Sequence, residues 1–475
     1  MQTVGNARII GLALLSTVVV GCRAPLDEAD RAIAQAGDAC RRGDFDAAIR
    51  YCTEAIRLRP GFACAYYDRA VAYGKKGDLD SAIADFTEVI RLKPSFGEAY
   101  CSRGGAYGDK GDLDKSIADL TEAIRLDPKY APAYYNRGVA NGKKGYIAKA
   151  LADYSEAIRL NRDYTWAYRN RAIIYETNGD RGKAIADFDV VIRLKPDDAQ
   201  AYSDRGGAYY DKGDYDHSVS DYAEAIRIDP KSASAYDDRG LAYYKKGEFD
   251  KAIADYTEAI RLDRNYARAY YNRGCIYAER GQIDKAIADY TEAIRAQPGY
   301  AYALCNRGFA YARGGHYDKA ISDYNEAIRL DSKDAKARHY RGDAYRHKRE
   351  YDKAIADYTE AIRLDLKYAD AYNSRGNAYW QIGEHDKAIA DCTEAIRLSP
   401  KDAYAYFNRG TAYKKKGEYK RAIADYTEAI RLNPNDADAF WGRGSCYRKT
   451  GEAAKADEDS AQARKLGYKS NLDLL

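Results

Sequence analysis

The sequence lacks the features by which several classes of protein are recognised. Its 475 residues include one Met and five His, and no low-complexity linker interrupts them. The 77 basic and 73 acidic residues are spread along the chain without the basic stripe that a phosphate-backbone binder needs, so nucleic acid is not expected as a partner.

The cysteines also argue against a metal site, because the eight that follow Cys22 share no CxxC spacing and no metal-ligand pattern. Cys275 and Cys305 fall in adjacent periods of the sequence, where either a disulfide or two free thiols would fit. The His residues are scattered, whereas an enzyme needs a convergent set of reactive groups. No cofactor is expected.

What the chain has in abundance is repetition. Arg followed by Gly, or twice by Ala, recurs every 34 residues from Arg69 to Arg443 without an insertion. Each period holds two segments with apolar residues at helical spacing, and a Gly such as Gly281 separates them. Units of this kind bury their apolar faces against their neighbours, which predicts a stacked all-α array whose function lies on a surface.

The constrained positions of each unit carry further marks. Small residues stand at positions 8, 20 and 27 and aromatics at 4, 11 and 24, as in the unit that begins at Ala267. This pattern resembles the tetratricopeptide repeat over nearly the whole chain. The resemblance implies a right-handed superhelical solenoid of about 13 antiparallel helix-pair repeats of 34 residues. Two departures are Arg in place of a large aliphatic residue at position 7, and Arg349 in place of the turn Gly of the tenth unit.

The N-terminus predicts export and a lipid anchor. Arg8 precedes an apolar run from Ile9 to Val20, which is too short to span a bilayer as a helix. The tetrapeptide that ends in Cys22 resembles the lipobox of bacterial lipoproteins, which implies acylation of Cys22; the alternative is an ordinary secretory signal with an incidental Cys. By analogy with lipoprotein sorting, Arg23 favours the outer membrane, facing the periplasm.

These observations predict four segments. Residues 1–21 form the signal peptide, residues 22–28 the acylated Cys and a short tether, residues 29–470 the repeat array, and residues 471–475 a C-terminal tail.

The resemblance implies that positions 2, 5, 9, 12 and 13 of each first helix line a concave surface. Rigid aromatic side chains are frequent anchors for protein partners. The aromatics expected to contact a partner on this surface are Tyr271, Tyr302, Phe309, Trp380, Tyr404, Phe407 and Trp441. Glycines occupy such positions in the second to fourth units, where they either admit a ligand backbone or mark a slack segment.

The tenth unit concentrates basic residues around a single acid, Asp343. Its expected partner-binding side chains are Arg338, His339, Arg341, Arg346 and His347. Such a patch suits an acidic peptide or a terminal carboxylate, and the alternative is a solvated charged face. His339, Asp343 and His347 share one helical stripe, but the stripe drifts around the helix and converges poorly, so no metal is predicted.

The sequence therefore predicts a non-enzymatic protein-protein interaction scaffold, anchored by lipid in the bacterial cell envelope. Its partners would be one or more proteins or peptides, with an acidic one suited to the tenth-unit patch. The membrane would be contacted only through acyl chains. The alternative function is binding of glycan or peptidoglycan through exposed aromatics.

The lipid anchor is directly testable. Replacing Cys22 by Ala removes the acceptor sulfur of the lipobox-like tetrapeptide, so fatty-acid labelling of the protein should be lost and an uncleaved or mislocalised precursor should remain. Metabolic labelling with a palmitate analogue measures this, and unchanged labelling would contradict the assignment.

Overall fold

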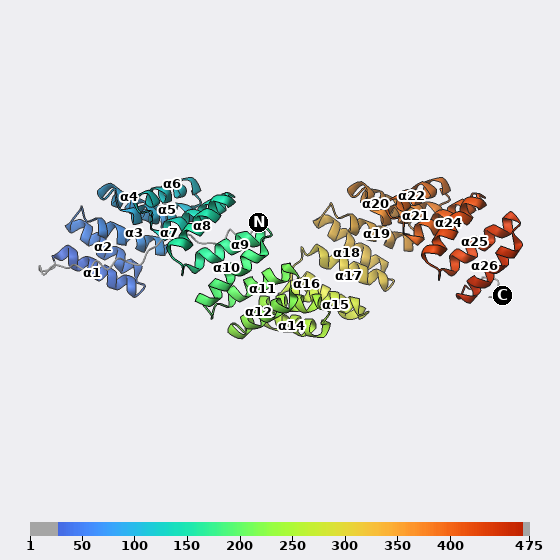
Figure 1. Ribbon diagram of the computed structural model, residues 1–475, viewed down its shortest axis with the longest axis horizontal. Coiled ribbons are helices and arrows are strands. Elements are labelled where there is room, and N and C mark those ends of the chain that lie inside the picture. The colour runs from blue at the N-terminus through green and yellow to red at the C-terminus, as the bar shows by residue number, and fades with distance from the viewer. Residues whose placement is uncertain (1–26, 469–475) are drawn as a thin grey trace. The chain divides into compact units, whose positions relative to one another are not determined.

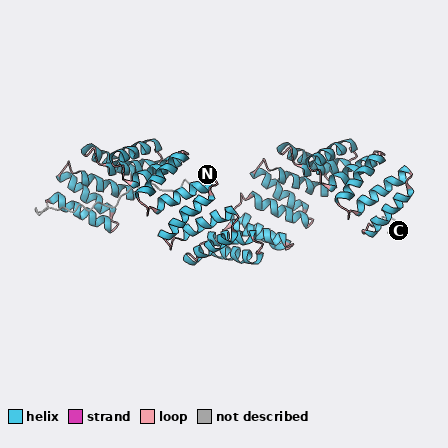
Figure 2. Ribbon diagram, viewed as in Figure 1, coloured by secondary structure: helices cyan, strands magenta, loops and turns pink. Residues whose placement is uncertain are grey.

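The computed structural model describes residues 27–468, and all regular structure in that range is α-helical (Figure 2). The expected signal peptide and Cys22 lie outside the described residues. The 26 helices found there alternate as first and second helices of the 34-residue units, as the sequence predicts.

Contacts divide the chain into two compact units, residues 1–248 and 249–475. The first, called unit 1, contains α1 (Glu28–Arg41), α2 (Phe45–Leu58), α3 (Ala63–Lys76), α4 (Leu79–Leu92), α5 (Gly97–Lys110), α6 (Leu113–Leu126), α7 (Ala131–Lys143), α8 (Ile147–Leu160), α9 (Thr165–Thr177), α10 (Arg181–Leu194), α11 (Ala199–Lys212), α12 (Tyr215–Ile228) and α13 (Ala233–Lys245).

The second, called unit 2, contains α14 (Phe249–Leu262), α15 (Ala267–Glu279), α16 (Ile283–Ala296), α17 (Ala301–Arg313), α18 (Tyr317–Leu330), α19 (Ala335–His347), α20 (Tyr351–Leu364), α21 (Ala369–Gln381), α22 (His385–Leu398), α23 (Ala403–Lys415), α24 (Tyr419–Leu432), α25 (Ala437–Thr450) and α26 (Ala453–Lys465).

Within each unit, every helix packs on the one before it and the one after it (Figure 1). Odd-numbered helices also contact the next odd-numbered helix, as α19 contacts α21 and α21 contacts α23. The odd helices therefore lie side by side on one face of each unit, which is the face that the sequence assigned to partner binding.

Glycine makes the turn inside each repeat possible. Gly77 has a φ of +85° and Gly281 a φ of +72°, values that only glycine adopts without strain. In the tenth repeat the same turn is made by Arg349 at a φ of +63°, the one non-glycine residue with positive φ in residues 27–468. This left-handed conformation costs about 1 kcal/mol, and it confirms that Arg349 takes the place of the turn glycine.

The small residue that follows each repeated Arg allows two helices to approach closely. A Cβ atom at Gly138 would lie 2.7 Å from the ring of Tyr154, and one at Gly342 would lie 2.7 Å from the ring of Tyr358. Both rings are almost fully buried. Close helix packing thus explains why a small residue follows the repeated Arg.

The Arg side of the dipeptide makes a joint between three helices. In the repeat of α17 and α18, Arg307 donates from Nε and Nη2 to the two carboxylate oxygens of Asp323, at 2.8 and 2.7 Å. Its Nη1 donates to Thr291 Oγ1 on α16 at 3.1 Å. The equivalent Arg–Asp pairs join Arg69 to Asp85, Arg103 to Asp119, Arg137 to Asp153, Arg171 to Asp187, Arg205 to Asp221, Arg273 to Asp289, Arg341 to Asp357, Arg375 to Asp391, Arg409 to Asp425 and Arg443 to Asp459.

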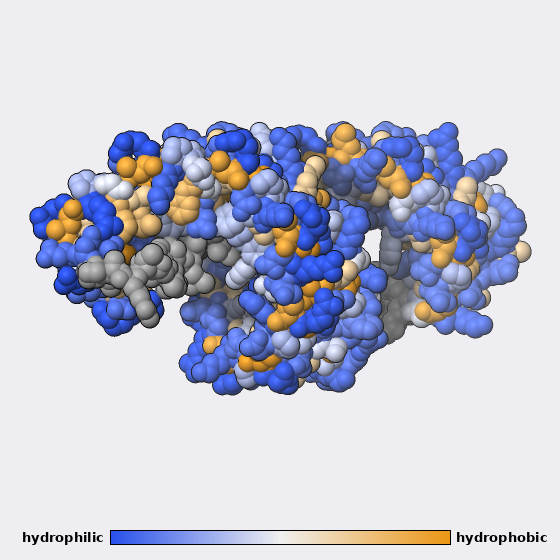
Figure 3. All heavy atoms as spheres, turned by 60° about the vertical axis from the view of Figure 1, so that its left-hand side comes forward, coloured by the Kyte–Doolittle hydropathy of each residue, from blue (hydrophilic) through white to orange (hydrophobic). Residues whose placement is uncertain are grey.

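The surface between these joints is mainly polar. In the view of Figure 3 the apolar residues form small patches separated by hydrophilic ones. None of the helices in residues 27–468 has the length and apolar character needed to cross a bilayer. All eight cysteines of this range are free thiols, so of the two states open to Cys275 and Cys305 the structure shows unpaired thiols.

The Arg–Asp joint predicts that removing a joint arginine destabilises the protein more than removing an exposed arginine of the same repeat. Arg307→Leu leaves Asp323, whose side chain is 8 % exposed, without its partner. Breaking a fully buried pair costs roughly 3–5 kcal/mol, and this partly buried one should cost somewhat less. Adding Asp323→Leu should restore most of the loss, because the stranded charge is then gone.

Native-state hydrogen exchange of α17 and α18 measures this effect locally. Arg329→Ala is the matched control, because its pair with Glu326 is exposed and such pairs contribute about 0–1 kcal/mol. Equal loss of protection in Arg307→Leu and Arg329→Ala would show that the joint does not stabilise the repeat.

Candidate functional site

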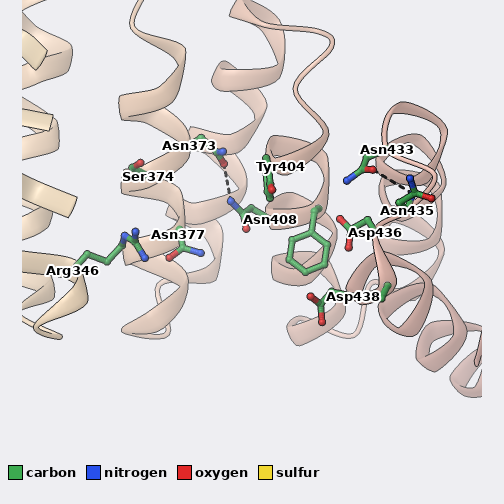
Figure 4. A pocket seen from close by; sticks show the side chains of 12 residues that line it. Arg346, Asn373, Ser374, Asn377, Tyr404, Asn408, Asn433, Asn435, Asp436 and Asp438 are labelled. Carbon is green, nitrogen blue, oxygen red and sulfur yellow. Dashed lines mark hydrogen bonds between the residues drawn. The ribbon is translucent and has the colours of Figure 1, made fainter. Parts of the chain in front are cut away.

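A groove lies on the odd-helix face of unit 2, with a cavity volume of about 650 Å³ (Figure 4). Helices α19, α21, α23 and α25, and the turn before α25, supply its walls. The residues that line it are Arg346, Asn373, Ser374, Asn377, Tyr404, Phe407, Asn408, Asn433, Asn435, Asp436, Ala437 and Asp438.

Carboxamides dominate the groove. Asn408 Nδ2 donates to Asn373 Oδ1 at 2.8 Å across α23 and α21, which fixes the orientation of both side chains (Figure 4). Asn377 lies one turn further along α21. Each carboxamide carries both a donor and an acceptor, so this lining can pair with either kind of backbone group.

The two ends of the groove carry opposite charges. Arg346 of α19 lies at one end, and Asp436 and Asp438 lie at the other (Figure 4). Arg346 is held in place by Asp343, with 3.5 Å between Arg346 Nε and Asp343 Oδ1. Asp436 caps α25 by accepting from the backbone N–H of Ala439 at 3.0 Å.

A second hollow of about 360 Å³ adjoins Arg346 on its other side, between α17 and α19. Phe309 and Tyr340 line it, with ring centroids 5.5 Å apart. His347 lines it too and stacks on Tyr317 at 5.1 Å with an interplanar angle of 3°. Among the residues predicted to bind a partner, Arg346 therefore lines both hollows.

The predicted basic patch of the tenth repeat is largely neutralised within the fold, which corrects part of that prediction. Arg341 is the joint arginine of its repeat and is held by Asp357 and by Asn325 Oδ1 at 2.6 Å. Lys348 pairs with Asp318 at 2.6 Å and with Glu350 at 3.0 Å. The guanidinium of Arg341 is therefore not available to a partner, because it is hydrogen-bonded to Asp357 and Asn325 between packed helices.

Arg338 does not line the groove either. Its Nη2 donates to the backbone carbonyl of Ser332 at 3.2 Å.

His339 is a packed core residue rather than a surface group. It is 7 % exposed, its Nε2 lies 3.0 Å from Ser374 Oγ, and its Nδ1 lies 3.1 Å from the Tyr368 hydroxyl. Burial lowers the pKa of His339, which favours the neutral ring. Within the described chain, no three His, Cys, Asp or Glu side chains are arranged to hold a metal ion.

The aromatic residues that were predicted to contact a partner differ in their solvent exposure. Tyr302 and Tyr404 are 70 % and 68 % exposed, and Phe309 is 46 % exposed. Phe407 lies in the groove against Tyr426, with ring centroids 5.8 Å apart.

The other three predicted rings are in contact with other side chains of the array. Tyr271 packs between Tyr290 and Tyr300, and Trp441 stacks on Tyr468 with 4.6 Å between ring centroids. The Trp380 ring is half-buried, with Lys415 Nζ 6.0 Å from its centroid.

Most of the groove's polar lining was missed from sequence. The sequence-based expectation counted only aromatic, glycine and basic residues at the inner positions. Asn373, Ser374 and Asn377 stand at positions 5, 6 and 9 of one repeat, where a run of small polar residues was visible in the sequence. Asn433 and Asn435 belong to a turn, which the inner-helix positions do not include.

Family comparisons agree with the repeat geometry. Models of the tetratricopeptide repeat match residues 63–96, 104–145, 131–164, 206–247, 240–279, 267–300, 301–334, 342–383, 369–402 and 403–436. The chain is a tetratricopeptide repeat protein. Such repeats serve as protein-protein interaction scaffolds and are generally non-enzymatic. The comparison with curated protein sequences finds no relative.

Several solved structures are similar to this chain. The Cut9–Hcn1 hetero-tetramer of the APC/C shows 16 % identity and a TM-score of 0.46, covering 89 % of this chain and 96 % of that chain. YrrB, described as having an unusual peptide-binding site, shows 23 % identity and a TM-score of 0.36, covering 39 % and 95 %. MamA shows 32 % identity and a TM-score of 0.32, covering 34 % and 96 %.

Unit 1 of this tetratricopeptide repeat protein carries an acidic cluster on its odd helices. Glu176 of α9 lies against α11, where a Cβ at Gly207 would be 3.7 Å from its Oε1. Burial, followed by the charges of Asp204 and Asp211, raises the pKa of Glu176 to about 7, while Arg181 opposes the shift. Burial also raises the pKa of Asp204.

This shift predicts a pH dependence of local stability. Glu176 titrates near 4.5 in the unfolded chain and near 7 in the folded one. Its stabilising contribution is fully present below about pH 4.5 and is lost as the pH rises through about 7, because only the folded state then still binds the proton.

Hydrogen exchange of α9 and α11 between pH 5 and pH 8 should show this loss in the wild type and a flatter profile in Glu176→Gln. Glu156→Gln is the control, because the Glu156 side chain pairs with Arg159 and its pKa is lowered instead. Parallel profiles for wild type and Glu176→Gln would refute the assignment.

Proposed function

We propose that this tetratricopeptide repeat protein is a non-enzymatic scaffold that binds an extended segment of a partner protein in the groove between α19 and α25. The observation that carries the proposal is the lining of the groove. Five asparagines and one serine face a cavity of about 650 Å³ whose ends carry opposite charges.

An extended peptide presents one unpaired N–H and one unpaired C=O at each residue. Asparagine side chains satisfy both kinds of group, because each carboxamide donates and accepts. Asn408 and Asn373 are already oriented by the hydrogen bond between them, which reduces the ordering that binding would require.

The charges at the ends give the bound peptide a direction. Arg346 suits an acidic side chain or a C-terminal carboxylate, since guanidinium groups bind carboxylates by paired hydrogen bonds. Asp438 at the other end suits a basic group. The partner therefore needs one acidic group in register with Arg346, and not the broadly acidic character that the sequence of the tenth repeat suggests.

The location of the scaffold is also part of the proposal. The tetrapeptide that ends in Cys22 supports acylation and anchoring in a bacterial cell envelope, with the outer membrane facing the periplasm favoured by Arg23. Two or more acyl chains hold a protein stably on a membrane, whereas one chain does so only marginally.

The alternative is glycan or peptidoglycan binding, which rests on exposed rings such as Tyr302 and Tyr404. We favour a peptide because opposite charges at the two ends of the groove match a segment that carries both signs, whereas an uncharged sugar would use neither.

Selection from a displayed library of random octapeptides tests the proposal. The wild type should enrich peptides with an acidic residue near one end. Asn377→Ala combined with Asn408→Ala should weaken their binding by about 5- to 100-fold, since each lost hydrogen bond costs roughly 0.5–1.5 kcal/mol.

Asn265→Ala, in an exposed turn of unit 2, is the matched control and should leave binding unchanged. Circular dichroism confirms that each variant is folded. Enriched peptides that bind the double variant and the wild type equally would place recognition outside this groove, and enrichment of no peptide at all, with retention on purified peptidoglycan, would favour the glycan alternative.

A further inference from the structure

Every repeat from the second to the thirteenth except the fourth has a Tyr at its eleventh position, and in several of them the ring lies between two cations. The ring of Tyr175 lies 5.8 Å from the Arg171 guanidinium and 5.3 Å from Lys183 Nζ. The same two-sided arrangement surrounds the rings of Tyr277, Tyr311, Tyr379 and Tyr447. A cation over an aromatic face is attractive and favours a ring in this slot.

The first repeat has Ala39 at this position, but it also lacks both cations, with Gln35 and Ala47 in their places. The fourth repeat lacks only the ring, because Asn141 of α7 stands where the Tyr should be. Its carboxamide is short and buried, and its Nδ2 donates to Asp153 Oδ2 at 2.9 Å. Both cations of the cradle are still present as Arg137 and Lys149. Lys149 Nζ instead lies 5.1 Å from the ring of Tyr146, which is 45 % exposed.

The missing ring leaves a hollow in unit 1 of about 340 Å³. Ile117 and Ala152 form its apolar walls, Arg137 and Lys149 supply the charges, and Asn141 and Asp153 lie beside them. An engineered apolar cavity of about 150 Å³ is enough to bind benzene. The hollow is therefore large enough for an aromatic ring, and it keeps the surroundings that hold a tyrosine ring in the other repeats.

We propose that this hollow between α6, α7 and α8 is a second recognition site, which receives a tyrosine side chain projecting from a partner protein. The ring takes the place of the tyrosine that the fourth repeat lacks, with Arg137 and Lys149 over its faces. Tyrosine fits better than phenylalanine, because the carboxamide oxygen of Asn141 can accept a hydrogen bond from the phenol hydroxyl.

This site is independent of the asparagine-lined groove, since it lies in unit 1 and shares no residue with it. The Asn377→Ala and Asn408→Ala changes should leave it intact. If the groove bound no peptide, the proposal for the tyrosine site would still stand. If the tyrosine site bound no peptide, the proposal for the groove would still stand.

The test uses the full chain and the peptide acetyl-Gly-Gly-Tyr-Gly-Gly-amide with 3-fluorotyrosine at its centre, observed by fluorine NMR. The wild type should broaden the fluorine signal, and unlabelled Tyr peptide should displace the probe better than the Phe peptide. The Leu peptide should displace it at least tenfold less well, because it has no aromatic face for the cations.

Two variants separate the hollow from any other aromatic surface. Asn141→Tyr fills the hollow with the chain's own ring and should weaken peptide binding at least tenfold. Tyr175→Asn opens an equivalent hollow in the next repeat and, where circular dichroism shows it folded, should add a second site.

Equal binding by wild type and Asn141→Tyr would overturn the proposal, whatever Tyr175→Asn does. Equal displacement by the Tyr and Leu peptides would overturn it too. Binding of free p-cresol without binding of the tyrosine peptide would show that the hollow admits a phenol but not a partner's side chain, and would likewise overturn it.

Discussion

One interaction recurs through the array and ties its helices together: the Arg–Asp pair that joins the first and second helices of a repeat. In the repeat of Arg375, the guanidinium also donates to Thr359 on the preceding repeat and lies 5.7 Å from the Tyr372 ring. Bidentate pairing of this kind fixes both distance and orientation. A single side chain thus sets the geometry within a repeat and between repeats.

This joint explains why the repeat tolerates Arg where the family usually has a large aliphatic residue. The side chain of Arg375 is 16 % exposed, and its carboxylate partner Asp391 is 11 % exposed. Removing two charges from water is costly, and the cost is offset only when hydrogen bonds satisfy both groups. Asp391 accepts from Nε and Nη2, and Thr359 takes up Nη1, so both conditions are met.

Much of the fold follows from the sequence because stacking in a repeat protein is local. The 34-residue period, the turn glycines and the helical spacing of apolar residues predicted the helix pairs, and Arg349 was correctly identified as a turn residue. The same period contained the clue to the joint, since an Asp stands sixteen residues after each joint Arg in the pairs described. Arg341 was misassigned because it was considered within its own helix, where no partner is visible.

The candidate site was harder to predict, for a physical reason. Repeated positions are fixed by packing, whereas recognition depends on the few positions where one repeat differs from the others. Asn141 and Asn377 are such positions, but a single substitution reveals nothing about a hollow until the neighbouring helices are in place. His339 shows the converse, because its unusual identity suggested a surface role and packing against Tyr368 gives it a buried one.

The account's central claim is that partners are recognised on the odd-helix face of unit 2. Photo-crosslinking in living cells tests it most directly. A benzophenone amino acid is placed at position 404, whose Tyr lines the groove, and at position 366, an equally exposed Leu in a turn. Mass spectrometry of the adducts should find one defined partner segment joined to position 404 and absent from position 366. The same segment at both positions, or at position 366 alone, would contradict the claim.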